Sequence, residues 1–181
     1  KKKRFTVETK GGLVSIDLQV DRHGDAAAAT VEMGIATFKP DALPCSLNVP
    51  ELIQQPIEAG GRSLIFTGVS VGNPHCVVFK PTGESWSREE LLALGPALEH
   101  HKLFPKRTNV QLVVPTGRNE VFILIWERGA GETQASGSSS CAAASAAVRL
   151  GLVKSPVTVK MPGGVLNIAV APDFSLTMKG P

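Results

Sequence analysis

The 181-residue sequence predicts an α+β fold in which strands outnumber helices. Short runs such as residues 13–20 alternate apolar and polar side chains, which is the pattern of a strand with one buried face. Residues 138–150 are instead rich in alanine and carry small side chains on nearly every face. A helix of this kind is usually buried, because only small side chains let a sheet approach it from all sides. We therefore predict a mainly β protein with one internal helix.

The composition excludes several classes of protein. With 43% hydrophobic residues, the chain can bury the core of one or two small domains. The net charge of +3 is too small to indicate nucleic-acid binding, and the basic run at residues 1–4 is interpreted as a solvated chain end. No apolar segment approaches the roughly 20 residues that a membrane-spanning helix needs, and no secretory signal is visible.

The cysteines and histidines give no sign of a metal site. Cys45, Cys76 and Cys141 are scattered, and no pair has the spacing of zinc ligands. His100 and His101 are adjacent, so on a helix their side chains point in different directions, and a basic helix end is the better interpretation. We expect no metal, and a reducing, cytoplasmic location suits these cysteines.

The N-terminal part predicts strands that lead into a linker. Residues 5–9 and 13–20 alternate on either side of Gly11-Gly12, which predicts a hairpin. A polar turn follows, and a further strand ends near Met33. Prolines punctuate residues 40–50, which have no regular period, and this predicts a linker.

The rest of the chain predicts more strands around two helices. Residues 64–71 predict a strand, which Gly72-Asn73-Pro74-His75 interrupts and residues 77–79 resume. Two later runs, 157–161 and 165–170, flank a Pro-Gly-Gly turn and predict a second hairpin. The other predicted strands are residues 110–114, 121–126 and 175–178.

The first of the two helices has a clear start signal. Ser87 and Glu90 have the spacing of a capping box, and leucines follow at helical spacing as far as Leu98. Pro96 lies inside this pattern and lacks the N–H that a helix interior requires. We therefore expect Pro96 to kink the helix or to end it early.

The segment that leads into the Ala-rich helix predicts an anion site. Glu127 and Arg128 place opposite charges where a strand ends, and Gly137 lets the backbone approach a ligand. We expect Ser138 or Ser139 as the N-cap. The first turn of a helix has unpaired N–H groups and partial positive charge, so a carboxylate or a phosphate fits there. A carboxylate is preferred because the pattern is not a Walker loop.

Each of these features also has a plain structural interpretation. A glycine–serine loop can simply feed a packed helix, and Asn73 and His75 lie in an Asn-Pro turn that needs no function. In the functional interpretation, Asn73 presents its amide and His75 its imidazole to a pocket at a strand end. The charged pair Glu127 and Arg128 favours the functional interpretation for the helix.

Residues 129–144, GAGETQASGSSSCAAA, resemble the second active-site signature of the diaminopimelate epimerases, which are cofactor-independent amino-acid racemases. Ser136 stands where that signature has a catalytic cysteine. Three further pieces occur in the family's order, so the resemblance covers essentially the whole chain. They are Glu32-Met33-Gly34, then Gly72-Asn73-Pro74-His75-Cys76, then Phe104-Pro105 with Thr108-Asn109-Val110.

The resemblance implies a fold of two similar lobes, each a β-barrel-like sheet wrapped around a central helix. Residues 46–181 then form the C-terminal lobe, with its helix at about 138–150. Residues 1–45 supply closing strands of an N-terminal lobe that is incomplete in this chain, and we place the boundary near Cys45. The family's N-terminal lobe carries a second catalytic cysteine.

The resemblance also implies epimerisation of LL-diaminopimelate to meso-diaminopimelate, in lysine and peptidoglycan biosynthesis. Without a pyridoxal cofactor, the protein must stabilise the charge that follows α-proton removal, while two thiols exchange protons across the α-carbon. The implied substrate is a small amino acid, and neither nucleic acid nor a membrane is an implied partner. A homodimer is compatible with the resemblance. The implied catalytic residues are Ser136, His75 and Glu127. The implied substrate-binding residues are Asn73, Asn109, Glu127, Arg128, Gly137 and Ser138.

Ser136 is the main departure from the family pattern. A serine hydroxyl is a much weaker acid than a thiol, so we expect binding to survive and proton transfer to be impaired. Cys141 is not a substitute, because it matches a cysteine of the signature that is not catalytic. Two other hypotheses remain beside an epimerase: an isomerase of the phenazine-biosynthesis type with Glu127 as its base, and a non-catalytic amino-acid-binding homologue.

Overall fold

The computed structural model describes residues 4–9 and 12–181, and its main element is one curved sheet. The strands are β1 (Arg4–Thr9), β2 (Gly12–Val20), β3 (Ala26–Ile35), β4 (Gln55–Ala59), β5 (Arg62–Ser70), β6 (Pro74–Phe79), β7 (Asn109–Gly117), β8 (Glu120–Glu127), β9 (Gly131–Thr133), β10 (Val157–Met161), β11 (Gly164–Val170) and β12 (Ser175–Gly180). The helices are the 3-10 helix η1 (Pro40–Ala42) and the α-helices α1 (Arg88–Glu99) and α2 (Gly137–Arg149).

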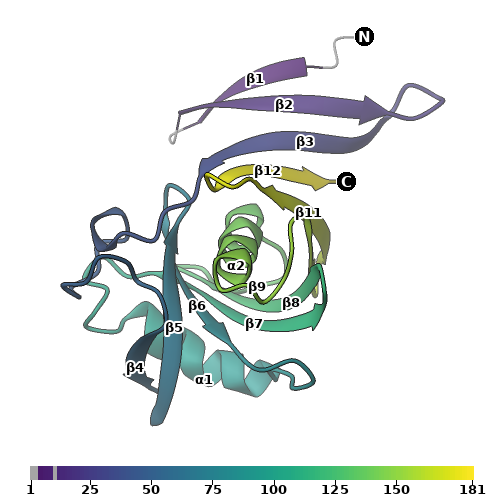
Figure 1. Cartoon of the computed structure of the whole chain (residues 1–181). Helices are drawn as coiled ribbons and strands as arrows, with labels where there is room; N and C mark the ends of the chain where they lie inside the picture. Colours follow the sequence, from purple (N-terminus) through teal and green to yellow (C-terminus); the bar gives the residue numbers. More distant parts are fainter. Residues whose placement is uncertain (1–3, 10–11) are drawn as a thin grey trace.

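The sheet closes around α2 (Figure 1). Its strand order is β1-β2-β3-β12-β11-β10-β8-β7-β6-β5-β4, with β9 paired to β8. A bridge between Thr37 and Ser70 joins the chain after β3 to the end of β5. The wall from β3 through β12 to β5 therefore forms a barrel, and the predicted α+β lobe with a β-barrel-like sheet around a central helix is confirmed.

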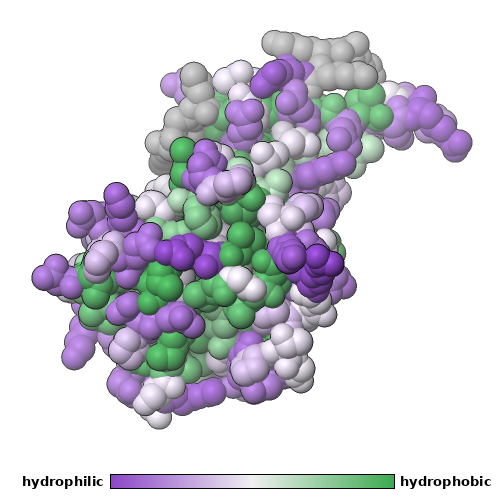
Figure 2. Space-filling model, viewed as in Figure 1, coloured by the Kyte–Doolittle hydropathy of each residue, from purple (hydrophilic) through white to green (hydrophobic). Residues whose placement is uncertain are grey.

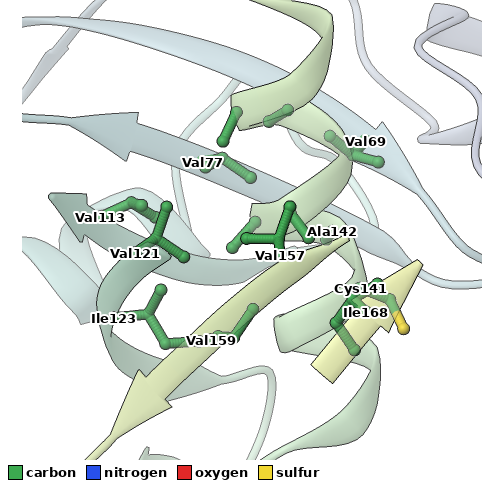
Figure 3. Close-up of a cluster of buried hydrophobic side chains, with 14 of the residues drawn as sticks. Val69, Val77, Val113, Val121, Ile123, Cys141, Ala142, Val157, Val159 and Ile168 are labelled. Carbon is green, nitrogen blue, oxygen red and sulfur yellow. The ribbon is translucent and has the colours of Figure 1, made fainter. Parts of the chain in front are cut away.

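Small side chains allow α2 to sit inside this barrel. Ala142, Ala143, Ala144, Ala146 and Ala147 are fully buried. Figure 3 shows valine and isoleucine side chains from the surrounding strands packed around the helix, which together form the larger of two hydrophobic clusters. A larger residue at these positions would overfill the barrel, so the alanines follow from the space available.

The start of α2 differs from the sequence prediction. The N-cap is Ser136, with extended backbone (φ −153°), and its hydroxyl accepts a hydrogen bond from the Ser139 N–H at 3.4 Å. The expectation of Ser138 or Ser139 as N-cap is therefore wrong. Every serine in this stretch has the chemistry of a cap, and the extended backbone selects Ser136.

The outer helix α1 lies against β7, β8 and β9 on the outside of the barrel and covers a second hydrophobic cluster (Figure 1). Its capping box is confirmed, because Ser87 Oγ accepts from the Glu90 N–H at 3.2 Å and Glu90 Oε2 accepts from the Ser87 N–H at 2.9 Å. The helix continues past Pro96 to Glu99, so the expectation of an early end is wrong.

The strands before residue 36 continue the sheet beyond the barrel. The predicted hairpin β1–β2 is confirmed, although part of its turn lies outside the described residues. Phe5 pairs with Ile16, Ile16 with Val31 and Val31 with Met178, so one apolar row crosses four strands. Phe5 is 37% exposed, and apolar residues show at the surface around β1–β3 in Figure 2. The division at residue 45 stays a prediction.

Two further sequence predictions have outcomes here. The linker at residues 40–50 contains the short helix η1 and no strand, but it is followed by β4, which was not predicted and whose Pro56 cannot donate to a ladder. Pro56 is tolerated because β4 is the edge strand of the sheet. Among the described residues, no helix combines the length and apolar character needed to cross a membrane.

Candidate active site

Three strand ends bring most of the candidate residues together. The parallel pairing of β6 and β7 places His75 opposite Asn109, and the antiparallel pairing of β7 and β8 places Val110 opposite Trp126. The turn before β6, the start of β7 and the end of β8 therefore share one edge of the barrel. We call the segment Trp126–Gly129 (126–129), where β8 ends, the charged corner.

Asn109 ties these strand ends to one another. Its side chain is buried, with only 6% of the residue exposed. The amide nitrogen donates to the Pro74 carbonyl at 2.8 Å, and the amide oxygen accepts from the Arg128 N–H at 3.0 Å. Since both ends of the amide bind backbone groups, Asn109 fixes the charged corner relative to the turn that carries Asn73.

His75 is fully buried beside Asn73. Its Nε2 lies 3.0 Å from Asn73 Oδ1. Burial is the main reason that the pKa of His75 is lowered, from 6.5 to about 3, while the Gln111 side chain opposes the shift and the charge of Arg128 adds to it. The imidazole is therefore neutral near pH 7, and its Nε2–H tautomer donates to the Asn73 oxygen and orients that amide.

Gln111 and Ser139 join this polar group to α2. Gln111 was missed in the sequence, and Ser139 was considered there only as an N-cap. Gln111 Nε2 donates to Ser139 Oγ at 3.0 Å, and both residues are completely buried. Among the described buried side chains, His75 Nδ1 and Gln111 Oε1 are the polar atoms without a hydrogen-bond partner. The available signal was a polar residue, Gln111, in the otherwise apolar run of β7.

The charged corner presents Glu127 and Arg128 at the barrel rim. Glu127 is half-buried, and the Thr133 hydroxyl lies 3.5 Å from its Oε2. Arg128 is exposed, and its Nη1 donates to the Lys106 carbonyl at 3.3 Å. The structure thus places a carboxylate and a guanidinium next to each other without an ion pair between them among the described contacts.

The start of α2 opens into a separate cavity of about 250 Å³. Ser136 and Gly137 line it, and the hairpin β10–β11 supplies most of the remaining wall through Met161, Gly163, Gly164, Val165 and Leu166. Gly137 approaches β12 so closely that a Cβ there would lie 2.9 Å from Met178 Sδ. The sequence predicted a turn at Gly163-Gly164 but not that this turn lines the cavity.

The first turn of α2 has backbone N–H donors without partners among the described residues. Within residues 4–9 and 12–181, no hydrogen bond uses the backbone N–H of Gly137 or Ser138. Ser136 Oγ lies 3.5 Å from Ser138 Oγ. The turn contains no acidic residue. Unpaired N–H groups and the positive end of the helix dipole suit an anion at this point.

The structure therefore divides the candidate residues into two groups. Ser136 and Gly137 line the cavity, with Ser138 in the same helical turn, whereas Asn73, His75, Asn109, Glu127 and Arg128 lie around the charged corner. Gln111 and Ser139 connect the groups through the barrel interior. The start of α2 can therefore bind an anion, and the charged corner can bind a second charged group.

Cys141 does not supply cysteine chemistry at the start of α2. Cys141 is fully buried in α2, and burial raises the pKa of its thiol to about 12. A protonated, inaccessible thiol cannot replace the acid or base expected at Ser136. Among the described residues, no group of three His, Cys, Asp or Glu side chains could hold a metal ion.

Comparison with known proteins identifies the family. The sequence profile described as "Diaminopimelate epimerase" matches residues 67–181, which is more than half of the chain. The chain belongs to the diaminopimelate epimerase family. It is 42% identical over 181 residues to a diaminopimelate epimerase of Azotobacter vinelandii, covering 99% of this chain and 62% of that relative. It is 39% identical over 173 residues to one of Methanothermobacter thermautotrophicus, covering 96% and 59%.

This epimerase-family chain thus spans about three fifths of the length of the curated relatives that it matches. Solved structures show the same fold at low identity. A hydroxyproline epimerase from Agrobacterium vitis matches with a TM-score of 0.68 at 14% identity, covering 99% of this chain and 57% of that one. A predicted epimerase from Pseudomonas aeruginosa matches with a TM-score of 0.63 at 19% identity, covering 98% and 62%.

Proposed function

We propose that this chain acts in the cofactor-independent epimerisation of LL-diaminopimelate to meso-diaminopimelate, with Ser136 at an acid/base position. The observation that carries the proposal is the open first turn of α2, with Ser136 and Gly137 lining a cavity of about 250 Å³. The membership of the family supports the reaction, because the relatives that match are diaminopimelate epimerases.

The reacting carboxylate binds at α2. The N–H groups of Gly137 and Ser138 donate to its oxygens, and the helix dipole stabilises the negative charge. When the α-proton leaves, charge spreads from the α-carbon into this carboxylate. Fixed donors then stabilise the transition state without a pyridoxal group.

The distal amino-acid group of the substrate binds at the charged corner. Glu127 attracts its ammonium and Arg128 its carboxylate, since the corner supplies one charge of each sign. Asn73, oriented by His75, donates or accepts a further hydrogen bond. Asn109 acts mainly by holding the Arg128 backbone, although its amide keeps one N–H and one lone pair for the substrate.

Proton transfer is the step that Ser136 limits. Its hydroxyl caps the helix, and among the described contacts it meets only Ser138 Oγ and the Ser139 N–H, neither of which is a base. A hydroxyl without a base is a poor acid/base group at neutral pH. We therefore expect the chain to bind diaminopimelate and to exchange its α-proton slowly.

The test is deuterium uptake at the α-carbon of diaminopimelate in heavy water, followed by NMR. Ser136→Cys should accelerate exchange at least about 100-fold, which is the usual contribution of general acid–base catalysis. Ser136→Ala is the matched control and should not accelerate it. Substrate binding without faster exchange in Ser136→Cys would contradict the proposal and favour a non-catalytic amino-acid-binding homologue.

The second alternative is an isomerase of the phenazine-biosynthesis type with Glu127 as the base. A phenazine-biosynthesis protein from Bacillus anthracis shares the fold, with a TM-score of 0.60 at 13% identity, covering 99% of this chain and 64% of that one. Turnover of a non-amino-acid substrate that Glu127→Gln abolishes and Ser136→Ala leaves intact would favour this alternative over the epimerase.

A further inference from the structure

Glu99 at the end of α1 is a buried carboxylate that the candidate site does not include. Its side chain is only 4% exposed. Oε2 accepts from Trp126 Nε1 at 2.8 Å, and Oε1 accepts from the Gly129 N–H at 2.8 Å and from Arg107 Nη1 at 3.3 Å. His100 Nδ1 lies 3.9 Å from Oε2. A carboxylate is rarely this buried unless its partners compensate it.

These contacts hold the two ends of the charged corner, on either side of Glu127 and Arg128. Trp126 immediately precedes Glu127, and Gly129 immediately follows Arg128. One carboxylate therefore binds the residue before the pair and the residue after it. The Arg128 N–H in between is held by Asn109, so consecutive N–H groups of the corner are fixed by two buried side chains.

The packing of α1 brings Glu99 to this place. Trp126 lies against Gly95, where a Cβ would come within 2.5 Å of the indole ring. Only glycine leaves room for this approach, and it lets the indole N–H reach Glu99 one turn further along α1. At the other end of the helix, Arg88 binds Glu132 of β9 through Nη2 at 2.7 Å.

The carboxylate of Glu99 is charged near pH 7. Burial on its own would raise the pKa, but the Trp126 and Gly129 donors and the positive charges of His100 and Arg107 together lower it below its ordinary value of 4.5. Hydrogen bonds to a charged acceptor are stronger than those to a neutral one. Replacing the carboxylate by an amide would therefore weaken the hydrogen bonds from Trp126 Nε1 and from the Gly129 N–H.

We propose that Glu99 is a positioning residue that fixes the backbone on either side of Glu127 and Arg128, and thus the spacing of their charges. Glu99 does not line the cavity at the start of α2. It acts through Trp126 and Gly129. The claim about the backbone stands on the contacts alone, whereas the consequence for the ligand depends on the proposed function.

The first test measures hydrogen exchange of the Arg128 and Gly129 amides by ¹⁵N NMR in the full chain. Glu99→Gln should accelerate exchange of both about ten-fold relative to the barrel strands, because the Gly129 N–H then binds a neutral acceptor and the backbone around the Arg128 N–H is held less firmly. Glu90→Gln is the matched control, since Glu90 is an ion-paired glutamate of the same helix without contact to the corner. Unchanged Arg128 and Gly129 exchange in Glu99→Gln would overturn the proposal.

Trp126→Phe covers the case in which Glu99→Gln does not fold. It keeps an aromatic ring near Gly95 but removes the indole N–H donor together with part of the ring system. We expect Trp126→Phe to accelerate hydrogen exchange more at the Gly129 amide than at the β7 amides. Equal acceleration throughout the chain would overturn the proposal. The second test is calorimetry with diaminopimelate, for which Glu99→Gln should weaken binding about ten-fold and Glu90→Gln should not. If the wild-type chain binds no diaminopimelate, the proposed function fails, and exchange still decides the role of Glu99.

Discussion

Both α-helices have a serine N-cap, but the donors of their first turns are satisfied differently. In α1, the Ser87 cap is joined by Glu90, whose carboxylate returns to the Ser87 N–H at 2.9 Å. In α2, Ser136 caps alone and no acid follows it in the first turn. The first helix thus satisfies its own positive end, and the second leaves that end for an external anion. The contrast teaches that a helix can either satisfy its first turn with its own side chains, as α1 does, or leave N–H groups unpaired, as α2 does at the anion site that we propose.

The positions of the helices differ as much as their ends. The residues of α2 are small because the barrel surrounds it, whereas α1 contacts the barrel from outside and exposes residues such as Leu92, at 41%. Ala143→Leu should therefore lower the free energy of unfolding by about 3 kcal/mol, because the barrel cannot expand around three extra carbons. Urea unfolding followed by circular dichroism measures this.

The matched control for that prediction is Ala93→Leu, the same substitution at an exposed position of α1. It should change the free energy of unfolding by less than about 0.5 kcal/mol. Equal effects at the two positions would show that the enclosure of α2 does not determine its composition.

An acidic residue can be added to the first turn of α2, where α1 has Glu90. Ser138→Asp places a carboxylate in the first turn, where it should stabilise the helix by about 0.5 kcal/mol. The same carboxylate should repel the substrate and weaken diaminopimelate binding at least ten-fold, roughly the effect of one like-charge contact. Calorimetry and thermal unfolding measure the two effects. Ser138→Asn, uncharged and similar in size, should have neither effect, and equal binding by both variants would contradict an anion site.

Acid should weaken the cap of α1. Burial alone would raise the pKa of Glu90, but hydrogen bonds from Lys80, Arg62 and the Ser87 N–H lower it from 4.5 to about 2. Because the folded pKa is the lower one, the stabilisation is complete above pH 4.5 and is lost as the pH falls toward 2. Its size is about 1 kcal/mol, the usual value of a helix cap.

Glu90→Gln is the variant that measures this contribution. Its stability should fall less steeply than that of the wild type between pH 4.5 and 2, as followed by urea midpoints at several pH values. Parallel profiles for the two proteins would mean that the capping carboxylate is not the group that titrates.

The sequence predicted the parts of this molecule that have a local cause. Alternation at residues 13–20 comes from the two faces of strand β2, and the spacing of Ser87 and Glu90 comes from a single helical turn. The alanines of α2 indicated burial because no other environment requires small residues on every side. These patterns follow from neighbours in the chain, so a single sequence contains them.

The parts that were missed depend on residues far apart in the chain. Glu99 looks like an exposed charge at a helix end until Trp126 and Gly129 surround it. Gln111 is polar in an apolar strand for a reason that only Ser139 and His75 supply. The N-cap was misplaced because Ser136 and its neighbours are equally good caps by chemistry, and backbone conformation decides among them.

The closure of the barrel has a consequence for how its wall can move. At the seam between the chain after β3 and β5, the direct β-bridge described is one residue pair, with Thr37 N–H to Ser70 O at 3.0 Å and Ser70 N–H to Thr37 O at 2.8 Å, and Leu52 adds backbone bonds to Phe38 and Gly68. The neighbouring joints are ladders of several residues, so we expect the wall to part at this seam at the least cost. Because Ser70 leads directly into the turn that carries Asn73, we expect a barrel that loosens at this seam to move Asn73 relative to the charged corner while its core stays intact.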